Sequence, residues 1–274
     1  MSELKLCDWI DIERLDWKYL SSNPNAINFL KKHPDKIDWS LLSLNINGID
    51  LLKENFDKIN WCYLSSNINA ISFLKENIDN IDWDWLSNNP NGIDLLKENP
   101  ENINWTELSS NPGAIELLKE NPNNICWSTF SSNPGAIELL KENPNKINWN
   151  GLSSNLNAIE ILKANPNKIN WNLLSGNLNP EAIQLLKKNP NKINWNVLSS
   201  NPGAIELLKE NPDKINWNVL SSNPAIFNYD YKKIKKDFEL LAEEIIAKAL
   251  HPKRIFKLIQ LYGEDEVYNN YFDD

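Results

Sequence analysis

The stretch that decides the fold begins at Trp195 and ends at Asn216, and it reads WNVLSSNPGAIELLKENPDKIN. Nearly the same letters stand at residues 127–148. Self-similarity at a fixed short period is the signature of a tandem-repeat protein, whose core grows along one axis. The repeat tryptophans recur every 22 residues, with one step of 24, and are predicted to form the repeat core: Trp17, Trp39, Trp61, Trp83, Trp105, Trp127, Trp149, Trp171, Trp195 and Trp217.

Each repeat contains two helix starts. Asn194 precedes Trp195 and can cap a first helix of about two turns, in part 3₁₀. Asn201 and Pro202 start a second, longer helix that runs to Glu210, because Asn is a good cap and Pro fits the first helical position. The next Asn-Pro pair ends this helix, since Pro disfavours helix in the residue before it. The sequence therefore predicts an all-α solenoid of about ten two-helix repeats.

Two polar residues recur almost without change between the helices of a repeat. They are Ser199 and Asn201 in the stretch quoted above. Serine and asparagine side chains can satisfy backbone groups at turns. We predict that they form a ladder that continues from repeat to repeat.

The two ends of the array depart from the repeat pattern. Residues 1–16 are predicted to be an N-terminal cap built from a degenerate repeat, and residues 17–228 form the solenoid. Asp230 is predicted to start an amphipathic helix that breaks at His251-Pro252, and a second helix runs to Leu261. Residues 229–263 either form a helical C-terminal cap, which solenoids need, or dock a second partner. Residues 264–274 form an acidic tail.

The repeat text also carries a family resemblance. The run Asn-Pro-x-Ala-Ile-x-Leu-Leu-Lys-x-Asn-Pro-x-Lys-Ile-Asn-Trp resembles the tryptophan-containing repeat proteins of giant viruses of the mimivirus type. The segment from Phe227 to Tyr231, with Glu243-Glu244 and the run from His251 to Arg254, resembles the terminal segment of that family. The resemblance covers nearly the whole chain and implies a viral origin. The alternation of helix lengths is similar to leucine-rich-repeat-variant solenoids, in which 3₁₀ and α-helices alternate in a superhelix.

Composition and charge narrow the classes of partner and compartment. The formal net charge is −9, which disfavours nucleic acid as a partner. Cys7, Cys62 and Cys126 are scattered, as expected of free thiols in a reducing compartment. Neither a signal peptide nor a membrane span is visible. We therefore expect an intracellular, soluble protein, in the host cytoplasm if it is viral, with the virus particle as the alternative location.

Catalytic chemistry has few candidate residues. The histidines are His33 and His251, which we interpret as structural, and no phosphate loop, zinc spacing or nucleophile elbow is present. The glutamates of the second helices, such as Glu116, recur at one repeat position and have a lysine three residues on, a pattern typical of a solvated face. The lysines at 232–236 are likewise interpreted as a solvated helix face. We predict no catalytic residue, cofactor or metal site.

One column of the repeat varies in size and polarity more than any other. It is the second residue after each repeat tryptophan, and we call it the variable column. Its first four members, Tyr19, Leu41, Tyr63 and Trp85, are large and apolar. Exposed apolar patches mark interfaces, so these four are candidate partner-binding residues. The alternative is that the column packs against the N-terminal segment or adjacent repeats.

These observations favour a non-enzymatic scaffold for protein–protein interaction, with one or more unidentified proteins as partners. Two alternatives remain open. The chain can be a structural component or spacer of a virus particle or assembly, since its central repeats are nearly identical. It can also be a substrate adaptor that docks through the C-terminal helices.

Overall fold

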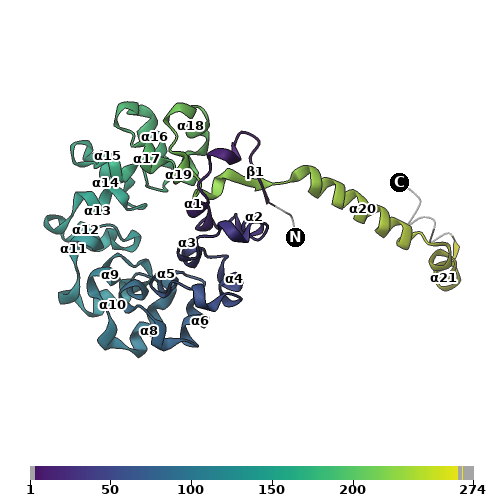
Figure 1. The fold of residues 1–274 in the computed structure, drawn as a ribbon, viewed down its shortest axis with the longest axis horizontal. Coiled ribbons are helices and arrows are strands. Elements are labelled where there is room, and N and C mark those ends of the chain that lie inside the picture. Colours follow the sequence, from purple (N-terminus) through teal and green to yellow (C-terminus); the bar gives the residue numbers. More distant parts are fainter. Residues whose placement is uncertain (1–3, 265–266, 268–274) are drawn as a thin grey trace. The chain divides into compact units, whose positions relative to one another are not determined.

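The computed structural model describes residues 4–264 and residue 267. Within them the chain is an all-α array of regular repeats, as predicted, and Figure 1 shows its course. The chain divides into two compact parts, a repeat part from Leu6 to Phe227 and a second part, here called the C-terminal part, that contains Leu4, Lys5 and the described residues from Asn228 onward. We number the repeats 1 to 10 from Trp17 to Trp217. The predicted acidic tail, 264–274, lies outside the described residues except for Glu264 and Val267.

Each repeat opens with a short α-helix that begins at the repeat tryptophan, which we call the Trp helix. The residue before the tryptophan caps it, as predicted: the Asn194 side chain accepts a hydrogen bond from the backbone N–H of Val197 at 3.1 Å. Cys126 is the exception, because it makes no capping bond to its helix. The Trp helices are α1 (Trp17–Ser21), α3 (Trp39–Leu44), α5 (Trp61–Ser66), α7 (Trp83–Ser87), α9 (Trp105–Ser110), α11 (Trp127–Phe130), α13 (Trp149–Ser154), α15 (Trp171–Leu174), α17 (Trp195–Leu198) and α19 (Trp217–Leu220).

The second helix of a repeat is as short as the first in most repeats. In repeat 9, Asn201 caps a 3₁₀ turn, and α18 follows it directly. Such entry turns are η5 (Pro90–Gly92), η7 (Pro112–Ala114), η9 (Pro134–Ala136), η13 (Pro202–Ala204) and η15 (Pro224–Ile226). The second helices are α2 (Ile27–Leu30), α4 (Ile49–Lys53), α6 (Ile71–Lys75), α8 (Ile93–Glu98), α10 (Ile115–Glu120), α12 (Ile137–Glu142), α14 (Ile159–Ala164), α16 (Pro180–Lys188) and α18 (Ile205–Lys209).

A 3₁₀ turn closes each repeat, and the sequence pattern predicted the end of the second helix but not this turn. The asparagine that precedes the turn bonds back to that helix: Asn211 Nδ2 donates to the Leu207 carbonyl at 2.9 Å. These turns are η1 (Ile12–Arg14), η2 (Pro34–Lys36), η3 (Phe56–Lys58), η4 (Ile78–Asn80), η6 (Pro100–Asn102), η8 (Pro122–Asn124), η10 (Pro144–Lys146), η11 (Pro166–Lys168), η12 (Pro190–Lys192) and η14 (Pro212–Lys214).

The fully buried core consists of aliphatic residues from both helices of each repeat. The residue three positions after the tryptophan is inaccessible in every repeat, as are a leucine and an alanine near the second helix in most repeats. Examples from repeat 1 are Leu20, Ala26 and Leu30. The core therefore lies between a layer of Trp helices and a layer of second helices.

The repeat tryptophans are half-buried, and the prediction that they form the core needs this correction. Each begins a helix at the edge of the core, so one side of its ring packs on its own repeat. Trp17 stacks on Phe29 with ring centroids 5.2 Å apart, and the Lys36 ammonium lies 4.6 Å from the Trp17 ring. Lys58 covers Trp39 in the same way at 4.4 Å. The tryptophan therefore joins the parts of one repeat, whereas the aliphatic residues fill the centre.

A ladder of buried asparagines joins the repeats, as predicted from their recurrence. Asn111 Nδ2 donates to the carbonyls of Ser87 at 2.8 Å and Asn89 at 2.9 Å in the preceding repeat. Ser87 Oγ accepts from the backbone N–H of Asn104 in the following repeat at 3.0 Å. The ladder asparagines are Asn23, Asn45, Asn67, Asn89, Asn111, Asn133, Asn155, Asn177, Asn201 and Asn223, all buried.

The array closes on itself into a ring. Asn23 Nδ2, in repeat 1, donates to the carbonyls of Ser221 at 3.0 Å and Asn223 at 2.9 Å, in repeat 10. The backbone N–H of Asp16 donates to Ser221 Oγ at 2.8 Å. These are the bonds that join consecutive repeats elsewhere, so repeat 1 follows repeat 10 as repeat 2 follows repeat 1. We call this interface the seam, and Figure 1 shows α1 beside α19 there.

Repeat 10 is assembled from both ends of the repeat part. Its first half, from Trp217 to Phe227, comes from the end of the array. Its closing turn is η1, and Arg14 in that turn lies 4.0 Å from the Trp217 ring, where other repeats place their own lysine. Trp9 takes the place of the second-helix aromatic, with its centroid 6.4 Å from that of Trp217. The segment 1–16, predicted as a cap, thus completes the last repeat instead.

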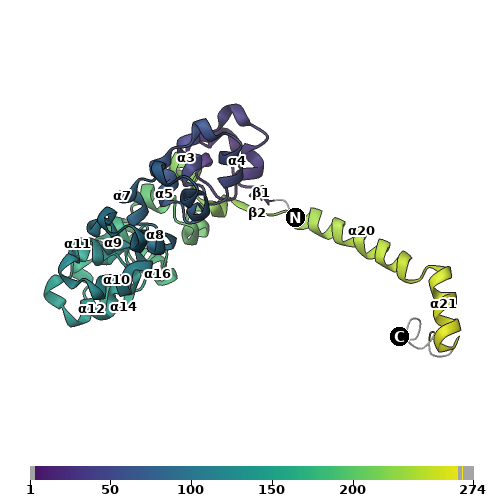
Figure 2. The same cartoon turned by 90° about the horizontal axis from the view of Figure 1, so that it is seen from below.

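The ring is a solenoid whose axis curves back on itself, so that repeat 1 meets repeat 10. Each interface turns the stack by a similar amount, and after ten repeats the turn is complete (Figure 1). Seen from the side in Figure 2, the ring is a band with α11 and α12 at the end opposite α3 and α4. The last repeat is covered by the first, so covering it does not fall to the C-terminal helices.

The C-terminal part begins with a short strand and continues in two helices. Strand β2 (Phe227–Tyr229) pairs with β1 (Leu4–Leu6) in a two-stranded sheet. Asp230 caps α20 (Tyr231–Ala249) by accepting from the Lys233 N–H at 3.2 Å. Helix α21 (Pro252–Tyr262) follows the break at His251 and ends at Gly263. Both helices were predicted at these positions.

The single step of 24 residues leaves the ladder unbroken. Asn177 donates to the carbonyls of repeat 7, and Asn201 donates to Ser175 and Asn177 at 3.2 and 2.9 Å. The two extra residues follow Asn177, where Leu178 is exposed. They lengthen the segment between Asn177 and the start of α16.

Candidate partner-binding surface on the Trp helices

The variable column lies on the side of the Trp helix that faces away from the core. Successive residues of an α-helix are rotated by about 100°, so the second residue after the tryptophan points about 100° away from the buried residue that follows it. Leu86 is inaccessible in α7, whereas its neighbour Trp85 is 43% exposed. Packing therefore leaves this column free to vary.

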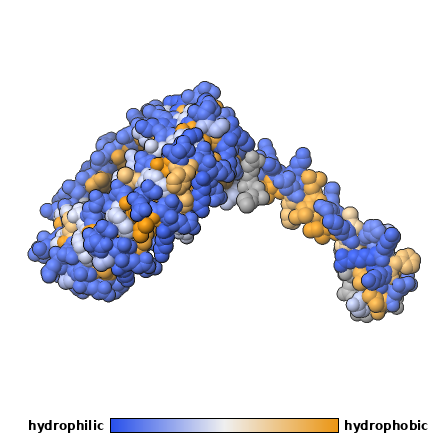
Figure 3. All heavy atoms as spheres, turned by 60° about the horizontal axis from the view of Figure 1, so that its bottom comes forward, coloured by the Kyte–Doolittle hydropathy of each residue, from blue (hydrophilic) through white to orange (hydrophobic). Residues whose placement is uncertain are grey.

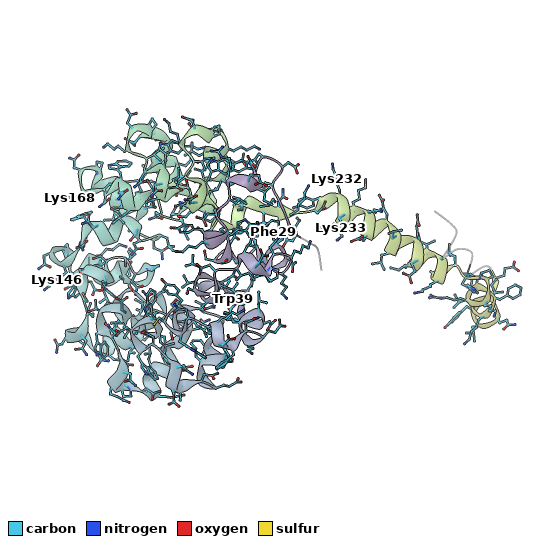
Figure 4. The ribbon with its side chains drawn as sticks, in the orientation of Figure 1. Phe29, Trp39, Lys146, Lys168, Lys232 and Lys233 are labelled. Atoms are coloured by element: carbon cyan, nitrogen blue, oxygen red, sulfur yellow. The ribbon has the colours of Figure 1, made fainter. Side chains whose placement is uncertain are left out.

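The ring places this side of the Trp helices on its inner face. Successive Trp helices contact one another, α3 with α5 and α5 with α7. In Figure 1, α3, α5 and α9 lie nearer the middle of the ring than α4, α8 and α10. Lys146 and Lys168, on the closing turns, lie at the outer edge in Figure 4. The variable column therefore runs around the inside of the ring.

The four candidate residues occupy this face with different exposures. Tyr19 is 39% exposed and Trp85 43%, while Leu41 and Tyr63 are half-buried. The structure brings two of them into contact: the rings of Tyr63 and Trp85 meet edge to face, with centroids 5.5 Å apart. An edge-to-face pair of this kind forms one continuous aromatic surface across repeats 3 and 4.

Ring closure extends the column beyond these four residues. Repeat 10 lies next to repeat 1, so Val219 precedes Tyr19 in the column. The members before it, Val197 and Leu173, are also apolar, and Leu173 is 39% exposed. We define the apolar arc as seven consecutive members: Leu173, Val197, Val219, Tyr19, Leu41, Tyr63 and Trp85. The first three were visible in the sequence, but their place beside Tyr19 was not, because the chain separates them by about 200 residues.

The remaining three positions of the variable column are Glu107, Thr129 and Gly151. Because none of them carries a large apolar side chain, the apolar arc does not continue around the whole ring. Where the arc meets Glu107, a shallow pocket is lined by Asp84, Trp85, Asn88, Asn104 and Glu107. Asn104 Nδ2 donates to Asp84 Oδ1 at 2.8 Å, and Asn88 Nδ2 donates to Glu107 Oε2 at 3.3 Å. One end of the arc is therefore an aromatic ring flanked by two carboxylates.

The recurring glutamates and His33, which the sequence analysis considered as candidate catalytic residues, make ion-pair and packing contacts. Glu116 Oε1 and Lys119 Nζ form an exposed ion pair at 2.8 Å, in keeping with a solvated face. The His33 ring packs on Trp17, with centroids 4.9 Å apart, and on Phe29 at 5.2 Å. Ordered packing of this kind accounts for His33 without a chemical role.

Two of the sites with shifted pKa values, at Cys126 and at the Lys163–Glu181 pair, have local causes. Hydrogen bonds with Ser128 and Thr129 hold the pKa of the Cys126 thiol below its ordinary value. The hydrogen bond from Lys163 lowers the pKa of the exposed Glu181 carboxyl, and Glu160 and Glu181 raise the pKa of Lys163. Neither site lies on the apolar arc.

The described residues contain no group of three or more His, Cys, Asp or Glu side chains that could hold a metal ion. Over the same residues, no helix is long and apolar enough to cross a membrane. Neither a curated protein nor a solved structure matches the chain. A family model described as "Periplasmic copper-binding protein (NosD)" matches residues 82–274.

Copper prefers thiolate, thioether and imidazole ligands. The matched range contains one cysteine, one histidine and no methionine. Cys126 lies in repeat 5, with its Sγ 3.2 Å from Ser128 Oγ, and His251 caps α21 by accepting from the Lys253 N–H. These residues do not provide a copper site, and we assign none. The match spans more than half of the chain, and by it the protein belongs to the NosD family.

Proposed function

We propose that the protein is a non-enzymatic scaffold that binds one or more proteins through the apolar arc. The observation that carries the proposal is the contrast within one helix turn: the variable column is partly exposed, while the residue that follows it is buried. Large aromatic side chains that folding does not require are typical of binding surfaces. The resemblance of the repeats to those of giant viruses adds to the proposal that the protein acts inside an infected cell.

The chemistry of the arc suggests what its partner offers. Seven apolar positions fit a partner segment with several apolar side chains. At the end of the arc, the Trp85 ring lies between the Asp84 and Glu107 carboxylates in the same pocket. A lysine or arginine of the partner would meet both a ring face and negative charge there. The net charge of −9 favours such a partner over nucleic acid.

A spacer in a particle remains the alternative, and ring closure weighs against it. A spacer becomes longer when repeats are added, whereas a ring that closes at its tenth repeat has no free end for further repeats. The continuous arc, in contrast, exists only because the ring closes.

Replacing Tyr63 and Trp85 together by alanine tests the proposal. We expect a loss of less than about 1 kcal/mol in unfolding free energy per side chain, because both lie outside the core. Capture of the partner from extract should weaken by about 2 kcal/mol or more, which is about 30-fold. Thermal melts and quantitative pull-downs measure the two effects.

The matched control is the pair Trp61 and Trp83, which lie two residues before the arc residues on the same two helices. Their replacement by alanine should destabilise the ring by about 2–3 kcal/mol each, less than the ~3–5 kcal/mol of a fully buried ring. If the Tyr63 and Trp85 variant melts as early as this control, the arc is part of the core and the proposed function is wrong.

A further inference from the structure

Helix α20 carries an apolar face that no other described residue covers. The face consists of residues spaced three and four apart: Tyr231, Ile234, Phe238, Leu241 and Ile245. Phe238 is 70% exposed and Leu241 52%, and α20 contains no buried residue. Figure 3 shows apolar residues gathered along the C-terminal helices. The spacing is that of a coiled-coil seam, in which such a face packs against a second helix.

The charges of α20 are divided between its two halves. The first half carries Lys232, Lys233, Lys235 and Lys236 against one acidic residue, and the second half carries Glu239, Glu243 and Glu244 against one lysine. This order opposes the helix dipole, which favours acidic residues near the start and basic residues near the end. Two internal pairs, Lys235–Glu239 at 3.8 Å and Lys248–Glu244 at 2.6 Å, offset part of this cost.

We propose that α20 binds α20 of a second copy of this chain in an antiparallel pair. The antiparallel arrangement lays the basic half of each helix against the acidic half of the other, which also corrects the unfavourable order of charges along each dipole. A parallel pair would place four lysines beside four lysines. The proposal concerns residues outside the ring and does not depend on the function of the apolar arc.

The spacing of the apolar residues sets the register of the pair. When the two helices cross between Glu239 and Leu240, Phe238 of one copy packs against Leu241 of the other, and Ile234 packs against Ile245. Every apolar layer is filled from Ile234 to Ile245, a length of about 17 Å at 1.5 Å per residue.

Two neighbouring leucines offer a matched test of this pair. Leu241 lies in the proposed interface, whereas Leu240 points to the opposite side of the helix and is 56% exposed. In analytical ultracentrifugation of the full chain we expect a concentration-dependent dimer. Leu241→Lys should weaken this dimer by about 100-fold, and Leu240→Lys, with the same change in charge, by less than about threefold. Both variants should melt at the wild-type temperature, because the ring does not contain α20.

The orientation is tested by disulfide trapping in a chain whose native cysteines are replaced by serine. One preparation carries Ile234→Cys and the other Ile245→Cys, and the two are mixed under mild oxidation. An antiparallel pair yields the mixed disulfide, whereas a parallel pair links each variant only to itself. The proposal is overturned by a wild-type chain that stays monomeric, by a dimer that survives Leu241→Lys, or by self-linked products alone.

Discussion

The same hydrogen bonds form at two kinds of interface: between repeats 4 and 5, which are consecutive in the chain, and at the seam between repeats 10 and 1. At the first, Asn111 donates to Ser87 and Asn89, and at the second, Asn23 donates to Ser221 and Asn223, all within 2.8–3.0 Å. The chain runs directly through the first interface but not through the second. Neighbouring repeats therefore recognise each other by side-chain chemistry alone, and a continuous chain is not needed.

The seam is nevertheless the more costly of the two to form. Its partners are about 200 residues apart in the chain, against about 22 elsewhere. Each doubling of a loop costs about 0.6 kcal/mol in closure entropy, so the seam costs about 2 kcal/mol more. The contacts of Arg14 and Trp9 with Trp217, and the β1–β2 pair, offset this cost. We expect the ring to open first at the seam.

The largest effect should come from removing the segment that completes repeat 10. A chain that starts at Asp16 lacks Trp9 and Arg14, and it should lose on the order of 5 kcal/mol in unfolding free energy, since an aromatic contact and one face of repeat 10 are lost. Urea unfolding measures the loss, and small-angle scattering should detect the open ring. A chain that ends at Asp230, without α20 and α21, is the control and should change by less than about 1 kcal/mol. Equal losses in both chains would contradict closure through the N-terminal segment.

The ladder asparagine can be removed at the seam and in the interior. Asn23→Ala and Asn111→Ala each remove the donor of one buried serine carbonyl and one of the two donors of an asparagine carbonyl, which should cost about 2–4 kcal/mol. Amide hydrogen exchange should distinguish the two variants. In Asn23→Ala, the backbone amides of repeats 1 and 10 should be the first to lose their protection from exchange. A loss below about 1 kcal/mol for Asn23→Ala, beside a full loss for Asn111→Ala, would show that the seam is open in solution.

The Trp helix of repeat 6 allows one interior interface to be strengthened. Cys126 stands where other repeats have Asn or Asp, and it makes no capping bond. Cys126→Asn should therefore raise the unfolding free energy by about 1 kcal/mol. A thermal melt measures the gain, and Cys62→Asn, on an exposed position inside α5, is the control without gain. An unchanged melting temperature would mean that capping does not limit this interface.

The contribution of the cationic side chain that covers a repeat tryptophan can be compared between the seam and an ordinary repeat. Arg14→Ala at the seam and Lys58→Ala in repeat 2 should each cost about 0.5–1 kcal/mol, because each leaves one ring face uncovered. Arg14→Lys restores the residue that ordinary repeats use and should recover most of the loss. If Arg14→Ala has no effect on urea unfolding, the guanidinium does not contribute to closure.

The smallest effect concerns the one irregular repeat. Deleting Leu178 and Asn179 restores the text Asn-Pro-Glu-Ala-Ile at the normal spacing of 22 residues. The ladder already passes this point unbroken, so the change in unfolding free energy should be below about 0.5 kcal/mol. A loss of several kcal/mol in a denaturant titration would instead make these two residues part of the ring's closure geometry.

The sequence alone determined the units of this protein and their boundaries. Capping residues, prolines and periodic leucines act within a few residues of each other, so the starts of α17, α20 and α21 could be predicted from local chemistry. The ladder of Ser199 and Asn201 could be predicted because an invariant polar pair at a turn must satisfy backbone groups. The variable column could be found because packing does not constrain it.

Only the tertiary structure decided where the ends of the array go. The rotation at each interface depends on how side chains pack, and small differences in that rotation accumulate over ten repeats into either an open superhelix or a ring. For this reason Arg14 was assigned to a cap although it completes repeat 10, and Val219 was not placed beside Tyr19. The tryptophans were assigned to the core because they recur, yet they lie at its edge, since recurrence reports that a position is constrained and not how deeply it is buried.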